Sequence, residues 1–188
     1  VIQGVASHVR NVTKAVLRPG IDMNEPVDSP LCLSDVVATS RHKDVGVAIV
    51  NVGASTTSLA VYEEGDLLHS AVIPIGADHI TADIAIGLRT SLEIADVLKR
   101  QYVNAAAQNV NKFQDIDLQS LGAPTSEVVS LRFISDIAQA RVEEIFERVE
   151  QELKKIDRSG MLPAGVLLTG GGVKLEGMPE VAKTIVRL

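Results

Sequence analysis

The chain has 188 residues, of which 46% are hydrophobic and 22% charged, and its net charge is -6 at pH 7. This length and composition predict one ordinary globular domain or two small ones. The negative charge argues against binding to nucleic acid and to acidic membrane surfaces, since both need Lys and Arg to neutralise phosphates. Because Cys32 is the single cysteine, an internal disulfide is excluded and a reducing compartment is favoured.

The first 44 residues are predicted to hold a helix and a long connection. Apolar residues recur at helical spacing from about Val5 to Leu17, and the Pro19-Gly20 pair ends that helix. Prolines and serines between residues 21 and 44 indicate a connection with one short helix near 33–38.

A three-stranded meander is predicted next. Residues 45–52 form an apolar run typical of a strand buried on both faces. A second strand is expected at 59–62, a turn at 63–66 and a third strand at 67–75.

The segment after the meander reads as a smaller lobe. Gly76-Ala77-Asp78 opens a helix that would bury Ile80, Ile84 and Leu88, and the spacing of Thr90 and Glu93 predicts a capping box for a helix through about residue 102. Two short strands are expected at 112–118 and 127–133, around a turn at 122–124.

The last third of the chain predicts a helix, a strand and a helix. Ser135 is the expected cap of a long helix that ends near Ile156, followed by a buried strand at 166–168 and a closing helix at 179–186. The whole order predicts an α/β layered fold with an α+β lobe inserted between about Asp78 and Arg141.

Two loops of small residues follow predicted strands about 120 residues apart, at 50–58 and 167–174. The first reads Val-Asn-Val-Gly-Ala-Ser-Thr-Thr-Ser, and the second reads Leu-Leu-Thr-Gly-Gly-Gly-Val-Lys. Small side chains leave backbone N–H groups accessible, which is the requirement for binding phosphate and adenosine. Each loop alone is also an ordinary way to turn a corner.

The order and spacing of these loops resemble one half of the actin, sugar-kinase and chaperone ATPase superfamily. Within it, the chain is most similar to the FtsA family of bacterial actin-like cell-division proteins, in the segments 72–85, 87–90, 140–146 and 168–177. The resemblance implies an actin-like (ribonuclease H-like) half. Residues 1–44 would be the tail of the first half and its connection, 45–77 and 141–188 the nucleotide-binding subdomain 2A, and 78–140 the inserted subdomain 2B.

The resemblance also implies site residues on the first loop. Its backbone and hydroxyl groups would contact the β- and γ-phosphates, and its first polar residue would orient Mg²⁺ through water. Here that residue is Asn51, whose neutral amide keeps the shape of the usual aspartate and loses its charge. The residues assigned to this role are Asn51, Gly53, Ala54, Ser55, Thr56 and Thr57.

The adenosine end is implied on the second loop and on the helix near residue 96. Gly170, Gly171 and Gly172 would let the backbone approach adenosine, with Lys174 either beside the ligand or a solvated charge. Asp96, Lys99 and Arg100 match the position at which related chaperone ATPases clamp the adenine ring. An exposed helix face is the other interpretation of these three residues.

The family likeness implies ATP and Mg²⁺ as cofactors of the intact protein, self-association into filaments, and binding of the FtsZ C-terminal tail through the lobe at 78–140. It implies a cytoplasmic protein at the inner face of the membrane at the division site, and at most weak ATPase activity. No catalytic residue and no metal site is assigned, and membrane contact from this chain is not expected. Since the first phosphate loop of the family has no counterpart here, the chain is interpreted as a fragment that binds ATP weakly or not at all.

Two other functions stay open. One is a component of type IV pilus assembly like PilM, whose phosphate loop is similar. The other is an ATP-dependent enzyme of the sugar-kinase or acetate-kinase type, which Asn51 disfavours because such enzymes have a carboxylate at that position.

Overall fold

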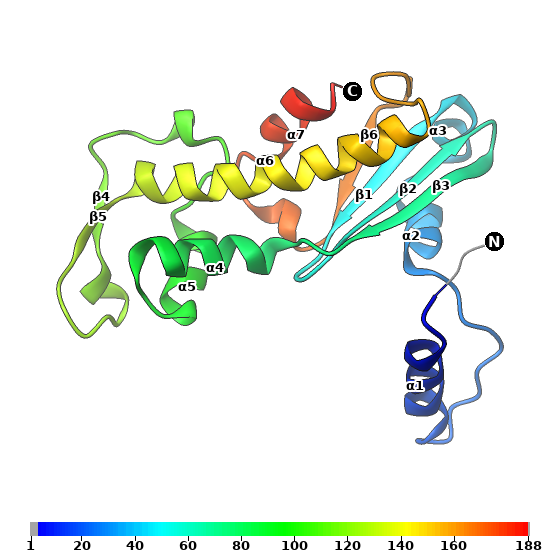
Figure 1. The fold of residues 1–188 in the computed structure, drawn as a ribbon, viewed down its shortest axis with the longest axis horizontal. Helices are drawn as coiled ribbons and strands as arrows, with labels where there is room; N and C mark the ends of the chain where they lie inside the picture. Colours follow the sequence, from blue (N-terminus) through cyan, green and yellow to red (C-terminus); the bar gives the residue numbers. More distant parts are fainter. Residues whose placement is uncertain (1–3, 188) are drawn as a thin grey trace.

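The computed structural model describes residues 4–187 and has a four-stranded sheet as its core (Figure 1). The strands are β1 (Val47–Val52), β2 (Thr57–Glu63), β3 (Asp66–Ile73) and β6 (Val166–Thr169). Their order is β3-β2-β1-β6, with β1 antiparallel to β2 and parallel to β6. The predicted meander and the predicted final strand are therefore confirmed, and β1 lies at the centre of the sheet.

Helices cover both faces of the sheet, which explains the continuous apolar run of β1. On one face, Val50 and Val52 join a core with α6 (Leu131–Lys155) and α7 (Met178–Val186). On the other face, Val47, Ile49 and Tyr62 pack with the end of α2 (Ser29–Val37), which is followed by α3 (Ser40–Val45). Alternate residues of one strand thus enter two different cores.

The lobe extends from one end of the sheet (Figure 1). It contains α4 (Ala77–Leu88), α5 (Leu92–Gln101), η1 (Ala107–Asn109), η2 (Leu118–Leu121) and a ribbon of β4 (Asp115–Asp117) with β5 (Val128–Ser130). Helix α6 starts directly after β5 and continues past α4 to the sheet, so a single helix of 25 residues belongs to both parts.

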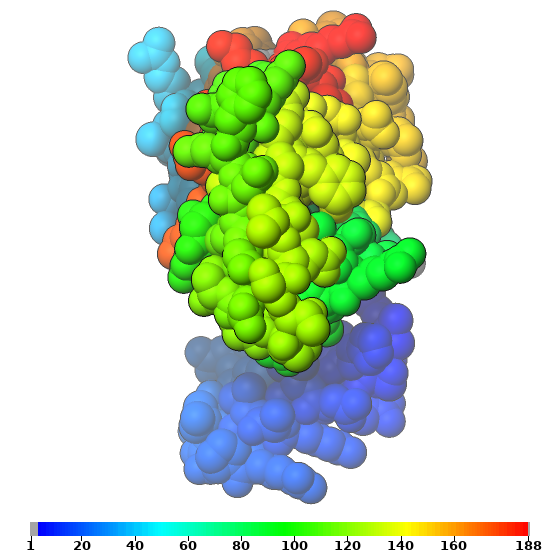
Figure 2. Space-filling model, turned by 90° about the vertical axis from the view of Figure 1, so that its left-hand side faces the viewer, coloured from blue at the N-terminus to red at the C-terminus, as the bar shows by residue number. Residues whose placement is uncertain are grey.

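Helix α1 (Ala6–Leu17) matches the prediction in its bounds but contributes no buried residue. Figure 1 shows it away from the sheet, and Figure 2, which views the lobe end-on, shows the same separation. None of the helices within residues 4–187 combines the length and the apolar character that a bilayer span requires.

Several predicted boundaries are wrong, and local contacts explain the differences. Helix α2 begins at Ser29 instead of residue 33, and α3 was not predicted; the side chain of Thr39 caps α3. The N-cap of α5 is Ser91, whose hydroxyl accepts the N–H of Ile94 at 3.4 Å, so Thr90 is not the cap.

The start of α6 also differs from the prediction. Residues 131–133 were expected in a strand and Ser135 as the cap, but the helix starts at Leu131 after Ser130. Ser135 lies fully buried in the second turn, where its hydroxyl accepts the N–H of Asn104 at 3.2 Å. A buried serine is tolerated inside the helix because it has this partner.

Candidate functional site

The two small-residue loops lie side by side at one end of the sheet. They meet because β1 and β6 are parallel neighbours, so the loops that follow them leave the same edge. A cavity of about 640 Å³ opens between them and the helices α4 and α5. Its lining consists of Gly53, Ala54, Ala77, Asp78, Ile80, Lys99, Arg100, Gln101, Val103, Gly171, Gly172, Lys174, Leu175 and Glu176.

The first loop uses its carbonyl groups to hold the start of α4. The carbonyl oxygens of Gly53 and Ala54 accept the N–H groups of Ala77 at 2.9 Å and Asp78 at 2.8 Å. These N–H groups belong to the first turn of a helix, which has no partners inside the helix itself. The position of α4, and with it one wall of the cavity, therefore depends on the shape of the first loop.

The backbone N–H groups of the first loop differ in whether they have an acceptor among residues 4–187. The N–H of Gly53 closes the loop by donating to the carbonyl of Thr56 at 2.9 Å. Within residues 4–187, the N–H groups of Ala54 and Ser55 have no hydrogen-bond acceptor. Adjacent free N–H groups at the edge of a cavity form a suitable site for an anion.

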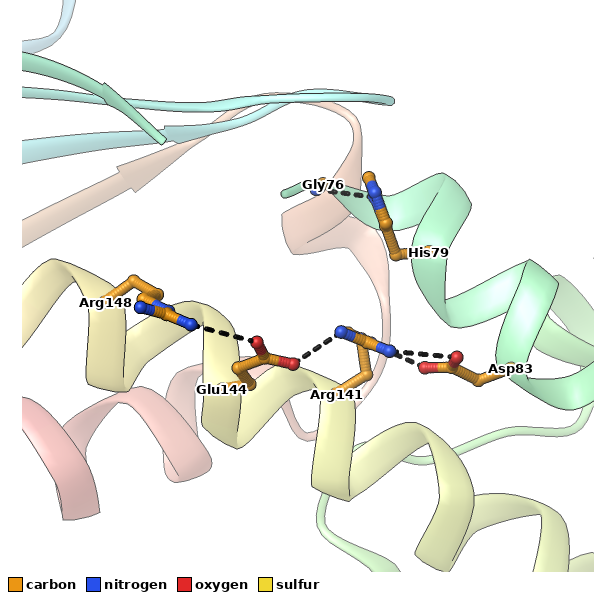
Figure 3. A network of polar contacts seen from close by, with 6 residues as sticks. All are labelled: Gly76, His79, Asp83, Arg141, Glu144 and Arg148. Carbon is orange, nitrogen blue, oxygen red and sulfur yellow. Dashed lines mark hydrogen bonds and ion pairs between the residues drawn. The ribbon is translucent and has the colours of Figure 1, made fainter. Parts of the chain in front are cut away.

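Gly76 is needed for the contact between the first loop and α4. A Cβ atom at this position would lie 2.4 Å from the carbonyl oxygen of Ala54. The N–H of Gly76 donates to Nδ1 of His79 at 3.1 Å, which completes the cap of α4 (Figure 3).

The three glycines of the second loop differ in what they contact. Gly170 has φ +96°, and a Cβ there would lie 2.4 Å from Oδ1 of Asn51. A Cβ at Gly172 would lie 2.5 Å from Cγ1 of Val52. A Cβ at Gly171 would meet nothing within 4 Å, so packing requires glycine at two positions and leaves open space at the third.

The side chain of Lys99 forms part of the α5 wall. Its ammonium group donates to Oγ1 of Thr81 at 2.5 Å and to the carbonyl of Ala77 at 3.4 Å, and it pairs with Asp96 at 3.1 Å. The stem of Lys99 thus lines the cavity while its charge is held by α4 and α5.

Asp96 lies between two basic residues of its own helix. Nε of Arg100 lies 2.8 Å from this carboxylate, in addition to the contact with Lys99. Partial burial raises the pKa of Asp96, but hydrogen bonds and charges from Lys99 and Arg100 outweigh it, so the net pKa is lowered. Asp96 lines a second, shallower hollow that also contains Asp78 and Arg100.

Seven of the thirteen predicted site residues line the main cavity: Gly53, Ala54, Lys99, Arg100, Gly171, Gly172 and Lys174. Asn51 and Gly170 pack against each other beside it. Ser55 and Thr56 are exposed in the first loop, whereas Thr57 is fully buried and donates its hydroxyl to the carbonyl of Ile75 at 2.8 Å. The proposed phosphate contact of Thr57 therefore competes with this hydrogen bond.

Sequence reasoning missed the other half of the lining, namely Ala77, Asp78, Ile80, Gln101, Val103, Leu175 and Glu176. A signal existed for the residues that directly follow a loop, such as Asp78 after Gly76 and Leu175 after the second loop. No sequence signal marks Val103, because it reaches the cavity only through the contact of the lobe with the second loop.

A polar network ties α4 to α6 (Figure 3). The guanidinium of Arg141 pairs with both carboxylate oxygens of Asp83, at 2.5 and 3.0 Å, and also with Glu144. Glu144 in turn lies 3.7 Å from Arg148. Hydrogen bonding to Asp83, opposed by partial burial and aided by both negative charges, raises the pKa of Arg141.

Comparison with known families identifies the relatives of this architecture. The family described as Cell division protein FtsA matches residues 48–188, three quarters of the chain. The chain belongs to the FtsA family. It is 36% identical to the Neisseria meningitidis cell division protein FtsA over 98% of this chain, and 34% identical to that of Pseudomonas aeruginosa over 94%. It covers 45% and 42% of these two relatives, so it spans less than half of their length.

Solved structures confirm the predicted actin-like α/β fold of this FtsA-family chain. The structure of MreB5 of Spiroplasma citri bound to ADP matches 99% of the chain and 60% of its own length, with a TM-score of 0.76 and 18% identity. The PilM-PilN type IV pilus biogenesis complex matches 96% of the chain and 45% of its own length, with a TM-score of 0.68 and 19% identity. At these identities the likeness concerns the fold alone.

Proposed function

We propose that this chain is the nucleotide-binding half of an actin-like cell-division protein and that its ligand is ATP or ADP. The observation that carries the proposal is the convergence of the two loops on one cavity, where the first loop has N–H groups without an acceptor among residues 4–187 and Gly171 of the second loop has open space beside it. A cavity of about 640 Å³ has the size of small-molecule sites. MreB5 of Spiroplasma citri, which has the same fold, was crystallised with ADP and with AMPPNP.

The two ends of the cavity suit the two ends of a nucleotide. The free N–H groups of Ala54 and Ser55 would receive the phosphates. The space above Gly171 and the stem of Lys99 would enclose adenosine, together with the apolar side chain of Val103. Arg100 lines the same wall, and its planar guanidinium is able to stack on a base.

The residues present also fit the Mg²⁺ that accompanies nucleotides in this fold. Mg²⁺ keeps most of its water and needs only one or two carboxylates besides phosphate oxygens. Asp78 lines the cavity and its N–H donates to the carbonyl of Ala54 in the first loop, so Asp78 is the residue that would supply a carboxylate for Mg²⁺. The neutral amide of Asn51 adds no charge there, and we expect any ATP turnover to be slow.

For the whole protein, we propose that it forms filaments and ties FtsZ filaments to the inner face of the membrane at the division site. The lobe at 78–140 would bind the C-terminal tail of FtsZ. The membership in the FtsA family supports this proposal. The lobe offers an apolar surface for a peptide tail: Phe113, Val128 and Phe133 are 91%, 65% and 51% exposed. We infer that the peptide tail covers these side chains.

Nucleotide binding is tested by titrating fluorescent ADP into two proteins. One is the full-length protein, with the length of the FtsA relatives, and the other is residues 1–188 alone. We expect micromolar affinity for the long protein. For the short chain we expect affinity at least about a hundredfold weaker, because half of the enclosing surface is missing. Absence of binding by the long protein in the presence of Mg²⁺ would overturn the proposal.

The partner is tested with two immobilised peptides, the C-terminal tail of FtsZ and the tail of PilN. The PilN peptide is included because the fold of this chain is similar to that in the PilM-PilN complex, so binding to PilN is the main alternative to binding to FtsZ. We expect capture by the FtsZ tail only, and loss of capture when Phe113 is changed to Ser. Capture by the PilN tail alone would replace the cell-division function with a pilus function.

A further inference from the structure

Beside the nucleotide cavity, the segment 103–107 is fastened to the second loop and to α6. The N–H of Ala105 donates to the carbonyl of Glu176 at 2.7 Å, and Asn104 forms an isolated parallel bridge with Glu176. The segment leads directly out of α5, which carries Lys99 and Arg100. These contacts therefore join two walls of the cavity, the wall from α5 and the wall from the second loop.

Asn104 lies at the centre of this contact, with its peptide group on α6 and its side chain turned back onto its own segment. It is 9% exposed, its Oδ1 accepts the N–H of Ala106 at 2.8 Å, and its own N–H donates to Oγ of Ser135 on α6 at 3.2 Å. One side chain and one peptide group thus connect the end of α5, the segment that follows it and α6. Gln139, one turn further along α6, adds a hydrogen bond to the N–H of Ala107 at 2.9 Å.

The chain directly after the second loop is shaped to receive Asn104. Gly177 has φ +79°, and a Cβ there would lie 2.0 Å from Oδ1 of Asn104 and 2.5 Å from the backbone nitrogen of Ala106. Any side chain at 177 would therefore push the segment 103–107 away from the loop. The close approach extends to Glu176 and Leu175, which line the cavity opposite Arg100, Gln101 and Val103.

We propose that Asn104 is a positioning residue for nucleotide binding, because it sets the distance between the α5 wall and the second loop at the adenosine end. This inference rests on the proposed nucleotide function. Asn104 is not expected to touch the ligand itself, since it is buried and does not line the cavity. Its loss widens the adenosine end and leaves the phosphate end, at Ala54 and Ser55, as it was.

The test compares ADP with tripolyphosphate, which has no adenosine. Both compete for fluorescent ADP on the full-length protein, and the ratio of their inhibition constants is independent of the affinity of the probe. We expect Asn104→Ala to weaken ADP about tenfold, because it removes the buried hydrogen bond from the N–H of Ala106 and the packing of Oδ1 against Gly177, and to leave tripolyphosphate within about twofold. Ser135→Ala, which removes the acceptor on α6, is expected to shift the ratio in the same direction.

Ser34→Ala is the matched control. Ser34 is also fully buried and hydrogen-bonded, to the hydroxyl of Tyr62 at 2.8 Å, but it lies on the opposite face of the sheet. We expect it to lower the melting temperature and leave the ratio unchanged. An unchanged ratio in Asn104→Ala would overturn the positioning role while the nucleotide function stands. Failure of the unmutated protein to bind ADP would overturn both.

Discussion

The two loops around the cavity differ in how they contact the rest of the fold and in which groups they leave free for a ligand. In the first loop, carbonyl groups accept hydrogen bonds from the start of α4, and the N–H groups of Ala54 and Ser55 have no acceptor among residues 4–187. The second loop packs Gly170 and Gly172 against β1 and leaves only Gly171 facing open space. Groups that serve the fold and groups free for a ligand therefore lie within the same few residues of each loop, and single substitutions should separate the two roles.

The largest expected effect is on the packed part of the second loop. Gly170→Ala places a Cβ 2.4 Å from Oδ1 of Asn51 and 2.5 Å from the carbonyl oxygen of Val52, at a φ of +96° that alanine rarely adopts. We expect a loss of about 3 kcal/mol or more in the free energy of unfolding. Chemical denaturation measures it, and a loss under about 1 kcal/mol would show that the loop rearranges easily.

A smaller effect is expected where the first loop enters β2. Thr57→Val removes the hydroxyl that donates to the carbonyl of Ile75, and leaves that carbonyl without its partner. We expect a loss of about 1–3 kcal/mol in unfolding free energy. Thr56→Val, next to it and exposed, is the control and should change stability by no more than about 0.5 kcal/mol. Equal losses in both variants would contradict the separation of roles.

Gly171→Ala should weaken the ligand and spare the fold. Gly171 has φ −65° and ψ −32°, which alanine adopts readily, and its Cβ would meet no protein atom within 4 Å. We expect unfolding free energy to stay the same or rise by about 0.4–1 kcal/mol. ADP affinity of the full-length protein should fall about tenfold, because the methyl group occupies space meant for adenosine. Unchanged affinity in calorimetry would remove Gly171 from the site.

The smallest expected effect concerns Asp96 on the α5 wall. Its pKa in the folded chain is lowered, because Lys99 and Arg100 more than compensate for its burial. Its contribution to stability is therefore complete above the ordinary pKa of 3.8 and is lost as pH falls through the folded value below that. The side chain is 33% exposed, so we expect Asp96→Asn to remove less than about 1 kcal/mol of the acid-induced loss between about pH 5 and 3. Identical pH profiles for both proteins would contradict this.

The sequence was sufficient for the central sheet because β1 is apolar except at Asn51 and a tight turn separates β2 from β3. It was misleading at the start of α6, where Val128 to Ile134 alternates like a strand although the helix begins at Leu131. The choice there depends on tertiary contacts, including the burial of Ser135 against Asn104. Such contacts are not encoded in local spacing.

The same distinction applies to the candidate site. The glycines and small residues of both loops were recognisable because each loop follows a buried strand. The contributions of Gln101, Val103 and Glu176 were not, since the end of α5 and the segment after it meet Glu176 only in the folded chain. When four elements form a site, the sequence predicts only those residues that lie together in one recognisable segment, such as a loop of small residues after a strand.

The parallel pairing of β1 with β6 has a consequence for how the chain folds. This pairing places Ala48 beside Val166, and the entire lobe lies between them in the sequence. Adding β6 to the sheet therefore closes a loop of about 120 residues, which costs conformational entropy. The β1–β2–β3 meander needs only local turns and is free to form early. We expect the last strand to join late, after the lobe has brought α6 back to the sheet, and folding to be slow for a chain of this size. During synthesis, the edge of β1 that pairs with β6 therefore stays unpaired until the residues of β6 have been made.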